Sequence, residues 1–184
     1  MKNANAIIKS AIFAALAMTG FTAHAASNAQ TVITGDVVAA TCELEATPTV
    51  DLGNWAASEF DKVGPHKETQ DLTLGISGCK GALKEGGAIS AMVRGYNIEG
   101  SPTVFSKSGS TNTVGVQLSD AKGTVIANGG DILIASQSKL DPEGQANSSL
   151  DGHTVKLKAQ LFSTTAQTNI QHVEAPINFS IIYN

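Results

Sequence analysis

The sequence predicts a single all-β domain of the sandwich type. Short segments of alternating or β-branched residues recur between turn residues along most of the chain, which is typical of an all-β sandwich. Glycine is frequent, aromatic residues are sparse, and Ser, Thr and Asn are spread throughout. No segment has the 3.6-residue apolar period of an amphipathic helix of any length. These features together favour strands joined by turns.

The clearest internal strand covers residues 154–163. Its residues Val155, Leu157, Ala159 and Leu161 alternate with Lys156, Lys158 and Gln160, so one face is apolar and the other wet. Other strands are expected at residues 31–41, 48–52, 69–77, 88–98, 113–118, 132–134 and 176–183. Turn residues separate them, at positions 120–123, 128–130, 141–144 and 151–152.

The first 25 residues have the composition of a secretory signal peptide. Lys2 and Lys9 give a positive start, an apolar run follows at residues 11–18, and Ala23 and Ala25 supply the small residues of a cleavage site. The apolar run is shorter than the roughly 20 residues that a membrane-spanning helix needs. We therefore expect export, cleavage after Ala25 and a mature chain of 159 residues without a membrane span.

The net charge and the two cysteines exclude further classes of function. The mature chain keeps 10 basic and 16 acidic side chains, a net charge of −6, which gives no electrostatic basis for binding nucleic acid or anionic lipid. In an exported chain, Cys42 and Cys79 most simply form one structural disulfide. A metal pair is disfavoured, because no second Cys or His lies nearby to complete a tetrahedral site.

Catalytic and cofactor motifs are absent from the sequence. His66, His153 and His172 are scattered singly, and no metalloprotease motif, nucleophile elbow or phosphate-binding loop occurs. We therefore predict a protein that is not an enzyme and has no catalytic residues, no metal and no cofactor.

The two ends of the mature chain have strand-like patterns. In the N-terminal arm, residues 26–34, the side chains of Ala29, Thr31 and Ile33 lie on one face before Gly35 interrupts. The arm is either a strand placed outside the disulfide-closed domain or an ordinary first strand with a frayed end. At the C-terminus a half-buried strand is expected, with its apolar face formed by Ile177, Phe179, Ile181 and Tyr183. Unless this strand pairs on both sides, its edge invites another chain.

Six segments of the mature chain, in order, carry a family resemblance. They are residues 35–42 (GDVVAATC), 50–53 (VDLG), 76–79 (ISGC), 112–118 (NTVGVQL), 158–164 (KAQLFST) and the tail with Ala175, Phe179 and Tyr183. With the leader and the cysteine pair, they make the chain similar to the pilins of the chaperone–usher pathway, especially the type 1 fimbrial major subunit family.

The resemblance implies an immunoglobulin-like sandwich, formed by residues 35–184, that lacks its final strand. In that family a periplasmic chaperone lends a strand, and the N-terminal extension of the next subunit later replaces it during assembly at an outer-membrane usher. The donor strand would then be residues 26–34. Tyr183 and Asn184, with its carboxylate, match the C-terminal signature that the chaperone grips, and Cys42 and Cys79 match the family disulfide.

The function expected from the sequence is therefore a structural subunit of an adhesive fimbria on the bacterial cell surface, which polymerises with neighbouring pilins. The alternative is a secreted monomeric immunoglobulin-like module that binds a carbohydrate or a host protein. Such a module would carry its last strand in its own chain. A hydrolase or metal enzyme would require the three histidines, or a Ser–His pair, to converge.

Overall fold

The computed structural model describes residues 40–81, 83, 85–137, 150–166 and 169–184. The expected signal peptide, the N-terminal arm with Ala29, Thr31 and Ile33, and the turn at 141–144 lie outside the described residues, as does most of the strand expected at 31–41.

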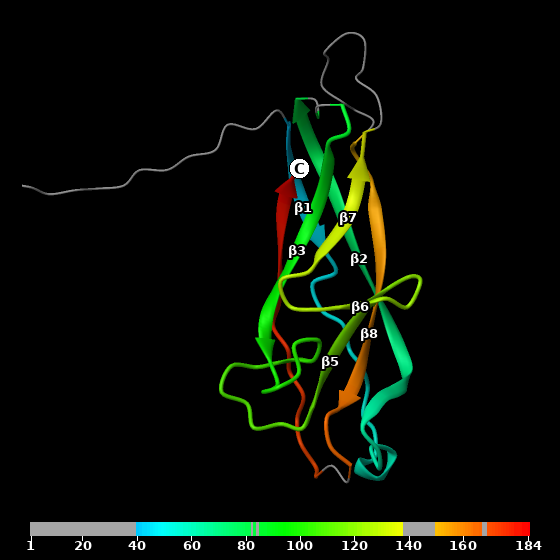
Figure 1. Cartoon of the computed structure of the whole chain (residues 1–184). Coiled ribbons are helices and arrows are strands. Elements are labelled where there is room, and N and C mark those ends of the chain that lie inside the picture. The colour runs from blue at the N-terminus through cyan, green and yellow to red at the C-terminus, as the bar shows by residue number, and fades with distance from the viewer. Residues whose placement is uncertain (1–39, 82, 84, 138–149, 167–168) are drawn as a thin grey trace, which may run out of the picture. The chain divides into compact units, whose positions relative to one another are not determined.

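The described part of the chain is built from strands, with one short 3₁₀ turn, Ala57–Glu59 (Figure 1). The strands, in chain order, are β1 (Ala40–Ala46), β2 (Gly64–Gly81), β3 (Ala88–Asn97), β4 (Phe105–Ser106), β5 (Val114–Asp120), β6 (Val125–Ile126), β7 (Asp131–Ser136), β8 (Thr154–Ser163) and β9 (Ile177–Tyr183).

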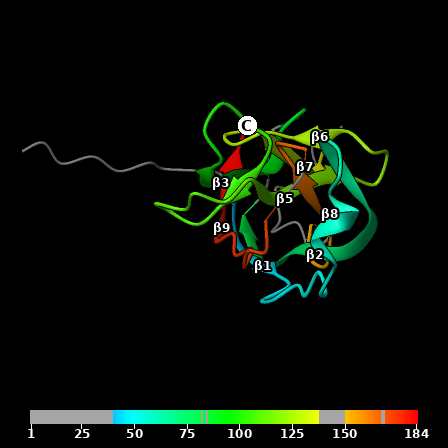
Figure 2. The same ribbon diagram turned by 90° about the horizontal axis from the view of Figure 1, so that it is seen from below.

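The strands form two antiparallel layers. The first layer has the order β1-β2-β8-β5, and the short strand β6 pairs with β5. In the second layer β3 lies between β7 and β9, and Figure 1 shows β9 in red beside β3. The two-residue strand β4 pairs with both β3 and β5 and so joins the layers. The turned view in Figure 2 shows β3 and β9 on one side of the domain and β2 and β8 on the other.

The core lies between the layers and is made by the inward faces of the strands. Leu72, Leu74 and Ile76 of β2 and Leu157 of β8 face Ile89, Ala91 and Val93 of β3, and all of them are buried. In β8 the alternation of apolar and polar residues in the sequence predicted the strand correctly from Thr154 to Ser163. Its apolar residues Leu157, Ala159 and Leu161 are buried. Full burial of one such aliphatic side chain contributes about 1.5–3 kcal/mol.

The predicted strands agree with the structure except at four places. β1 continues to Ala46, five residues beyond the end of the strand expected at 31–41. β2 begins five residues earlier than expected and ends at Gly81, because a long ladder with β8 and β1 extends it. The two-residue strands β4 and β6 were not predicted, since two residues are too few to show a period. The strand expected at 48–52 was wrong: those residues form no ladder with any described strand.

The turn at 120–123 confirms the prediction for that segment. The Asp120 carboxylate accepts hydrogen bonds from the backbone N–H groups of Lys122 and Thr124, each at 2.8 Å, and Gly123 has the positive φ (+87°) that glycine tolerates. The hydrogen bond from the Thr124 backbone is the largest cause that lowers the pKa of Asp120 below its ordinary value. The contribution of this turn to stability is therefore present above the unfolded pKa of the carboxyl and is lost as the pH falls through the lowered one.

Candidate functional site: an open groove between two sheet edges

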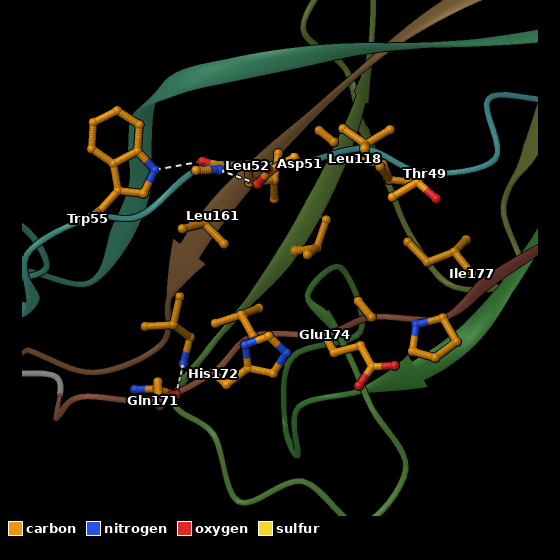
Figure 3. A pocket seen from close by; sticks show the side chains of 18 of the residues that line it. Thr49, Asp51, Leu52, Trp55, Leu118, Leu161, Gln171, His172, Glu174 and Ile177 are labelled. Carbon is orange, nitrogen blue, oxygen red and sulfur yellow. Dashed lines mark hydrogen bonds between the residues drawn. The ribbon is translucent and has the colours of Figure 1, made fainter.

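An open groove of about 770 Å³ runs between the edges of the two layers. Two segments without ladder partners on the groove side form its walls: residues 47–54, which follow β1, and residues 169–176, which lead into β9. In Figure 3, Thr49, Asp51 and Leu52 lie along one wall and Gln171, His172 and Glu174 along the other. Leu161 lies between them.

The first wall is fixed at both ends. At its start, two hydrogen bonds join Thr47 to Thr73. The Thr47 N–H donates to the Thr73 carbonyl (3.0 Å), and the Thr73 N–H donates to the Thr47 hydroxyl (2.9 Å). At its end the Trp55 indole donates to the Leu52 carbonyl (2.6 Å) and packs against His66 of β2, with 4.4 Å between ring centroids. Between these anchors the wall forms no ladder with a described strand.

The local sequence explains why this wall leaves the sheet. Pro48 has no N–H to donate, so the ladder with β2 stops after Thr47. Val50 and Leu52 nevertheless keep the alternation of a strand, half-buried and packed on the core, while Asp51 is exposed. The wall is therefore strand-like in pattern and lacks only a neighbour on its groove side.

The second wall is held by side chains. The Gln171 carboxamide bonds to the start of β5, and the Asn112 amide donates to the His172 carbonyl (2.6 Å). Lys107 donates to the exposed Glu174 carboxylate at 2.9 Å. That hydrogen bond is the main cause that lowers the pKa of Glu174 below its ordinary value, so the pair persists until the pH falls below the lowered pKa.

The floor of the groove is apolar. It consists of inward-facing residues of three neighbouring strands of the first layer: Leu72, Val114, Val116, Leu118, Ala159 and Leu161. Val116 is only half-buried although it packs against the core. A side chain laid over this floor would remove apolar surface from water, and such burial is worth about 25 cal/mol per Å².

β9 borders the groove along its C-terminal side. Its inward residues are those expected from the sequence, Ile177, Phe179, Ile181 and Tyr183; all pack against the core, and all are only half-buried. Among the described strands, β9 pairs with β3 alone. The backbone of Asn184 continues that ladder through two bonds with Ala88. The other edge of β9 therefore faces the groove with its backbone groups unpaired by any described strand.

Tyr183, near the C-terminal end of β9, joins this strand to β1. The Cys42 N–H donates to the Tyr183 hydroxyl at 2.6 Å, and that hydroxyl approaches the Cys42 carbonyl at 3.4 Å. Cys42 lies where the register between β1 and β2 shifts, and its sulfur is bonded to Cys79 at the end of β2. The phenol thus takes up backbone groups that the shift leaves outside the β1–β2 ladder.

We expect Tyr183→Phe to lower the free energy of unfolding by about 1 kcal/mol, because the ring still packs while the Cys42 N–H loses its acceptor. Urea unfolding of the purified mature protein measures the change. The matched control is Tyr96→Phe, whose side chain is 60% exposed and should change stability by less than about 0.5 kcal/mol. Equal stability of Tyr183→Phe and the wild type would contradict this role.

The possible metal-ligating side chains of the described residues are dispersed. No group of three or more His, Cys, Asp or Glu residues there could hold a metal ion. His66 packs between Trp55 and Phe60, whereas His172 lies on the second wall. In the same part of the chain, no helix is both long and apolar enough to cross a membrane. The groove offers an apolar floor and two strand edges, which suits binding of an extended chain.

Sequence reasoning found the tail face of β9 and the cysteine pair but missed the floor and the anchors of the walls. The floor was detectable as separate apolar strand faces at 113–118 and 154–163, yet their adjacency follows only from the pairing of β5 with β8. Nothing in the local sequence distinguishes Gln171 from the other polar residues of this segment.

The fold and the groove define an immunoglobulin-like sandwich of the pilin type. A model of the fimbrial protein family matches residues 18–184 of the chain. The structure is similar to the P pilus rod subunit PapA, with 16% identity and a TM-score of 0.57 over 78% of this chain and 99% of that chain. It is also similar to a chain of a chaperone–usher pilus, with 16% identity and a TM-score of 0.51 over 85% of this chain and 96% of that chain. No curated protein sequence matches the chain.

The chain therefore belongs to the fimbrial protein family and is a structural pilus subunit. The fold is the incomplete sandwich that the family resemblance implied: among the described strands, none lies between β9 and the first wall.

Proposed function

We propose that the groove is an acceptor site for one β-strand donated by a second copy of this chain, and that subunits polymerise by this donation. The observation that carries the proposal is the pair of strand-like edges, the first wall (residues 47–54) and β9, that flank an apolar floor with no described strand between them. An added strand would hydrogen-bond to both edges and cover the floor, which is a known mode of peptide recognition.

The donor that we propose is the N-terminal arm, residues 26–34, with Ala29, Thr31 and Ile33 facing the floor. Nine residues in an extended strand cover about 30 Å, enough to run past the seven residues of β9 at about 3.3 Å each. Donation from one copy to the groove of the next is a heterologous contact that does not close, so it builds a fibre.

Before assembly the groove needs another occupant, because unpaired strand edges promote aggregation. We propose that a periplasmic chaperone fills it with a strand of its own and contacts Tyr183 and Asn184, and that an outer-membrane usher then exchanges this strand for the arm of the next subunit. The half-buried state of Ile177, Phe179 and Ile181 supports a temporary cover of this kind. The subunit would thus pass through the periplasm on its way to the cell surface.

The test uses the mature chain with Ile33→Asp, which disables its own arm as a donor. The variant should remain monomeric by light scattering while the wild type forms fibres, because a carboxylate would be buried on the apolar floor. A synthetic peptide of residues 26–36 at a hundredfold excess over its Kd should stabilise the monomer by about 2.7 kcal/mol. That gain corresponds to a rise in Tm of about 5–10 °C for a chain of this size.

The matched control is Val32→Asp, which puts the same charge on the opposite face of the arm. This variant should still assemble, because its side chain would point to solvent. If Ile33→Asp assembles like the wild type, or the variant melts cooperatively at high temperature and ignores the peptide, the domain is complete without a donor. The monomeric binding module would then be the better account.

A further inference from the structure

We propose that Gln171 is a positioning residue for strand acceptance: it sets the distance between the second wall and the floor at the distal end of the groove. The distal end is defined by Trp55 and Gln171, which lie toward the same side in Figure 3, away from Thr49 and Ile177. This inference rests on the proposed acceptor function of the groove.

The Gln171 side chain makes four hydrogen bonds. Its Oε1 accepts from the backbone N–H groups of Thr113 (3.0 Å) and Val114 (3.1 Å). Its Nε2 donates to the Thr113 hydroxyl (3.2 Å) and to the Asn169 carbonyl of its own wall (3.1 Å). The carboxamide therefore joins the wall to the first residues of β5 on both its acceptor and its donor side.

These contacts replace a backbone ladder. On the other side of β5, the Thr113 carbonyl accepts from the Thr164 N–H at 2.8 Å, and Val114 pairs with Ser163 of β8. Toward the wall, the two N–H groups meet a side chain instead of a strand. Val114 and Val116 of the same strand form part of the floor, so the bonds of Gln171 link the wall directly to the floor.

The neighbouring contacts of the wall constrain it less. The Lys107–Glu174 pair is exposed on both sides, and pairs of that kind contribute little. The Asn112 amide holds one carbonyl, that of His172. Replacement of Gln171 by the similarly shaped Met would leave the Thr113 and Val114 N–H groups without their acceptor, which costs free energy wherever water cannot replace it. We expect the wall to shift there and to fit a donated strand less well.

The test compares peptide affinities in the mature Ile33→Asp chain with and without Gln171→Met. Calorimetric titration with the 26–36 peptide gives the Kd, and the emission of Trp55, the single tryptophan, reports occupation of the groove. We expect Gln171→Met to weaken binding about tenfold, a difference of about 1.4 kcal/mol. Gln171→Glu, which keeps both acceptor bonds, should stay within about threefold.

Shortened peptides of residues 26–33 and 29–36 separate positioning from general destabilisation. The loss of affinity caused by Gln171→Met should be smaller for the shortened peptide that no longer reaches the distal end. It should remain about tenfold for the shortened peptide that still reaches it. A matched control is Gln160→Met, which removes a part-buried amide bond to Gln117 (3.0 Å) between β8 and β5. It should lower Tm without changing peptide affinity.

Unchanged affinity in Gln171→Met, or an equal loss for all three peptides, would overturn the positioning role while leaving the acceptor function intact. Failure of the Gln171-containing chain to bind the 26–36 peptide at all would instead overturn the proposed function itself.

Discussion

Replacing Cys42 and Cys79 together by alanine should lower the free energy of unfolding by about 4 kcal/mol, the largest stability effect that we expect from a pair of substitutions. The two residues are 37 positions apart. A cross-link that closes a loop of that length lowers the conformational entropy of the unfolded chain, which stabilises the folded state by about this free energy. The bond also holds β1 to the end of β2 where their register shifts. Urea unfolding in the presence of saturating 26–36 peptide measures the loss.

Reductant provides the control for the disulfide. Treating the wild type with a thiol reductant should bring its urea midpoint close to that of the double variant, whereas the variant itself should not respond. A wild type that keeps its midpoint after verified reduction would show that the stabilisation does not come from the covalent link.

Replacing Val116 by aspartate should abolish fibre formation and weaken binding of the 26–36 peptide by at least about a hundredfold. Val116 lies half-buried in the floor, so an inserted strand would cover the new carboxylate without a partner for its charge. Val116→Ala, which removes only apolar contact, should weaken binding by about tenfold or less. Calorimetric titration in the Ile33→Asp chain gives both constants.

The matched control for Val116→Asp is Val125→Asp in β6. That side chain is 41% exposed and lies outside the groove, so the same change should leave peptide binding and assembly intact. Normal binding by Val116→Asp would mean that the donated strand does not cover the floor at this point.

Much of the fold was predictable because its signals are local. The alternation in β8 and β9 and the Asp120 turn each follow from a few consecutive residues, and the structure places them accordingly. The segment at 48–52 shows the limit: Val50 and Leu52 alternate like a strand, but a ladder needs a neighbour, and the described chain provides none on the groove side. A strand pattern without a partner is what a donated strand would complete.

The groove itself could not be predicted in the same way, because it arises from contacts between residues far apart in the chain. Leu72, Val116 and Leu161 form one floor only because β2, β8 and β5 are neighbours in that order. Tyr183 and Cys42 are 141 positions apart in the sequence and are joined by a hydrogen bond, as are Gln171 and Val114, which are 57 positions apart. No periodicity marks such pairs in advance.

The contacts of Cys42 with Cys79 and Tyr183 have a mechanical consequence for a fibre joined by donated strands. Tension on such a fibre would enter each subunit through the residues that precede Ala40 and would leave through the strands that grip the next arm. Cys42, two residues into β1, would pass the pull to β2 through a covalent bond and to β9 through its hydrogen bond with Tyr183. The force would therefore be shared among β1, β2 and β9 and would act along these strands, as shear between neighbours.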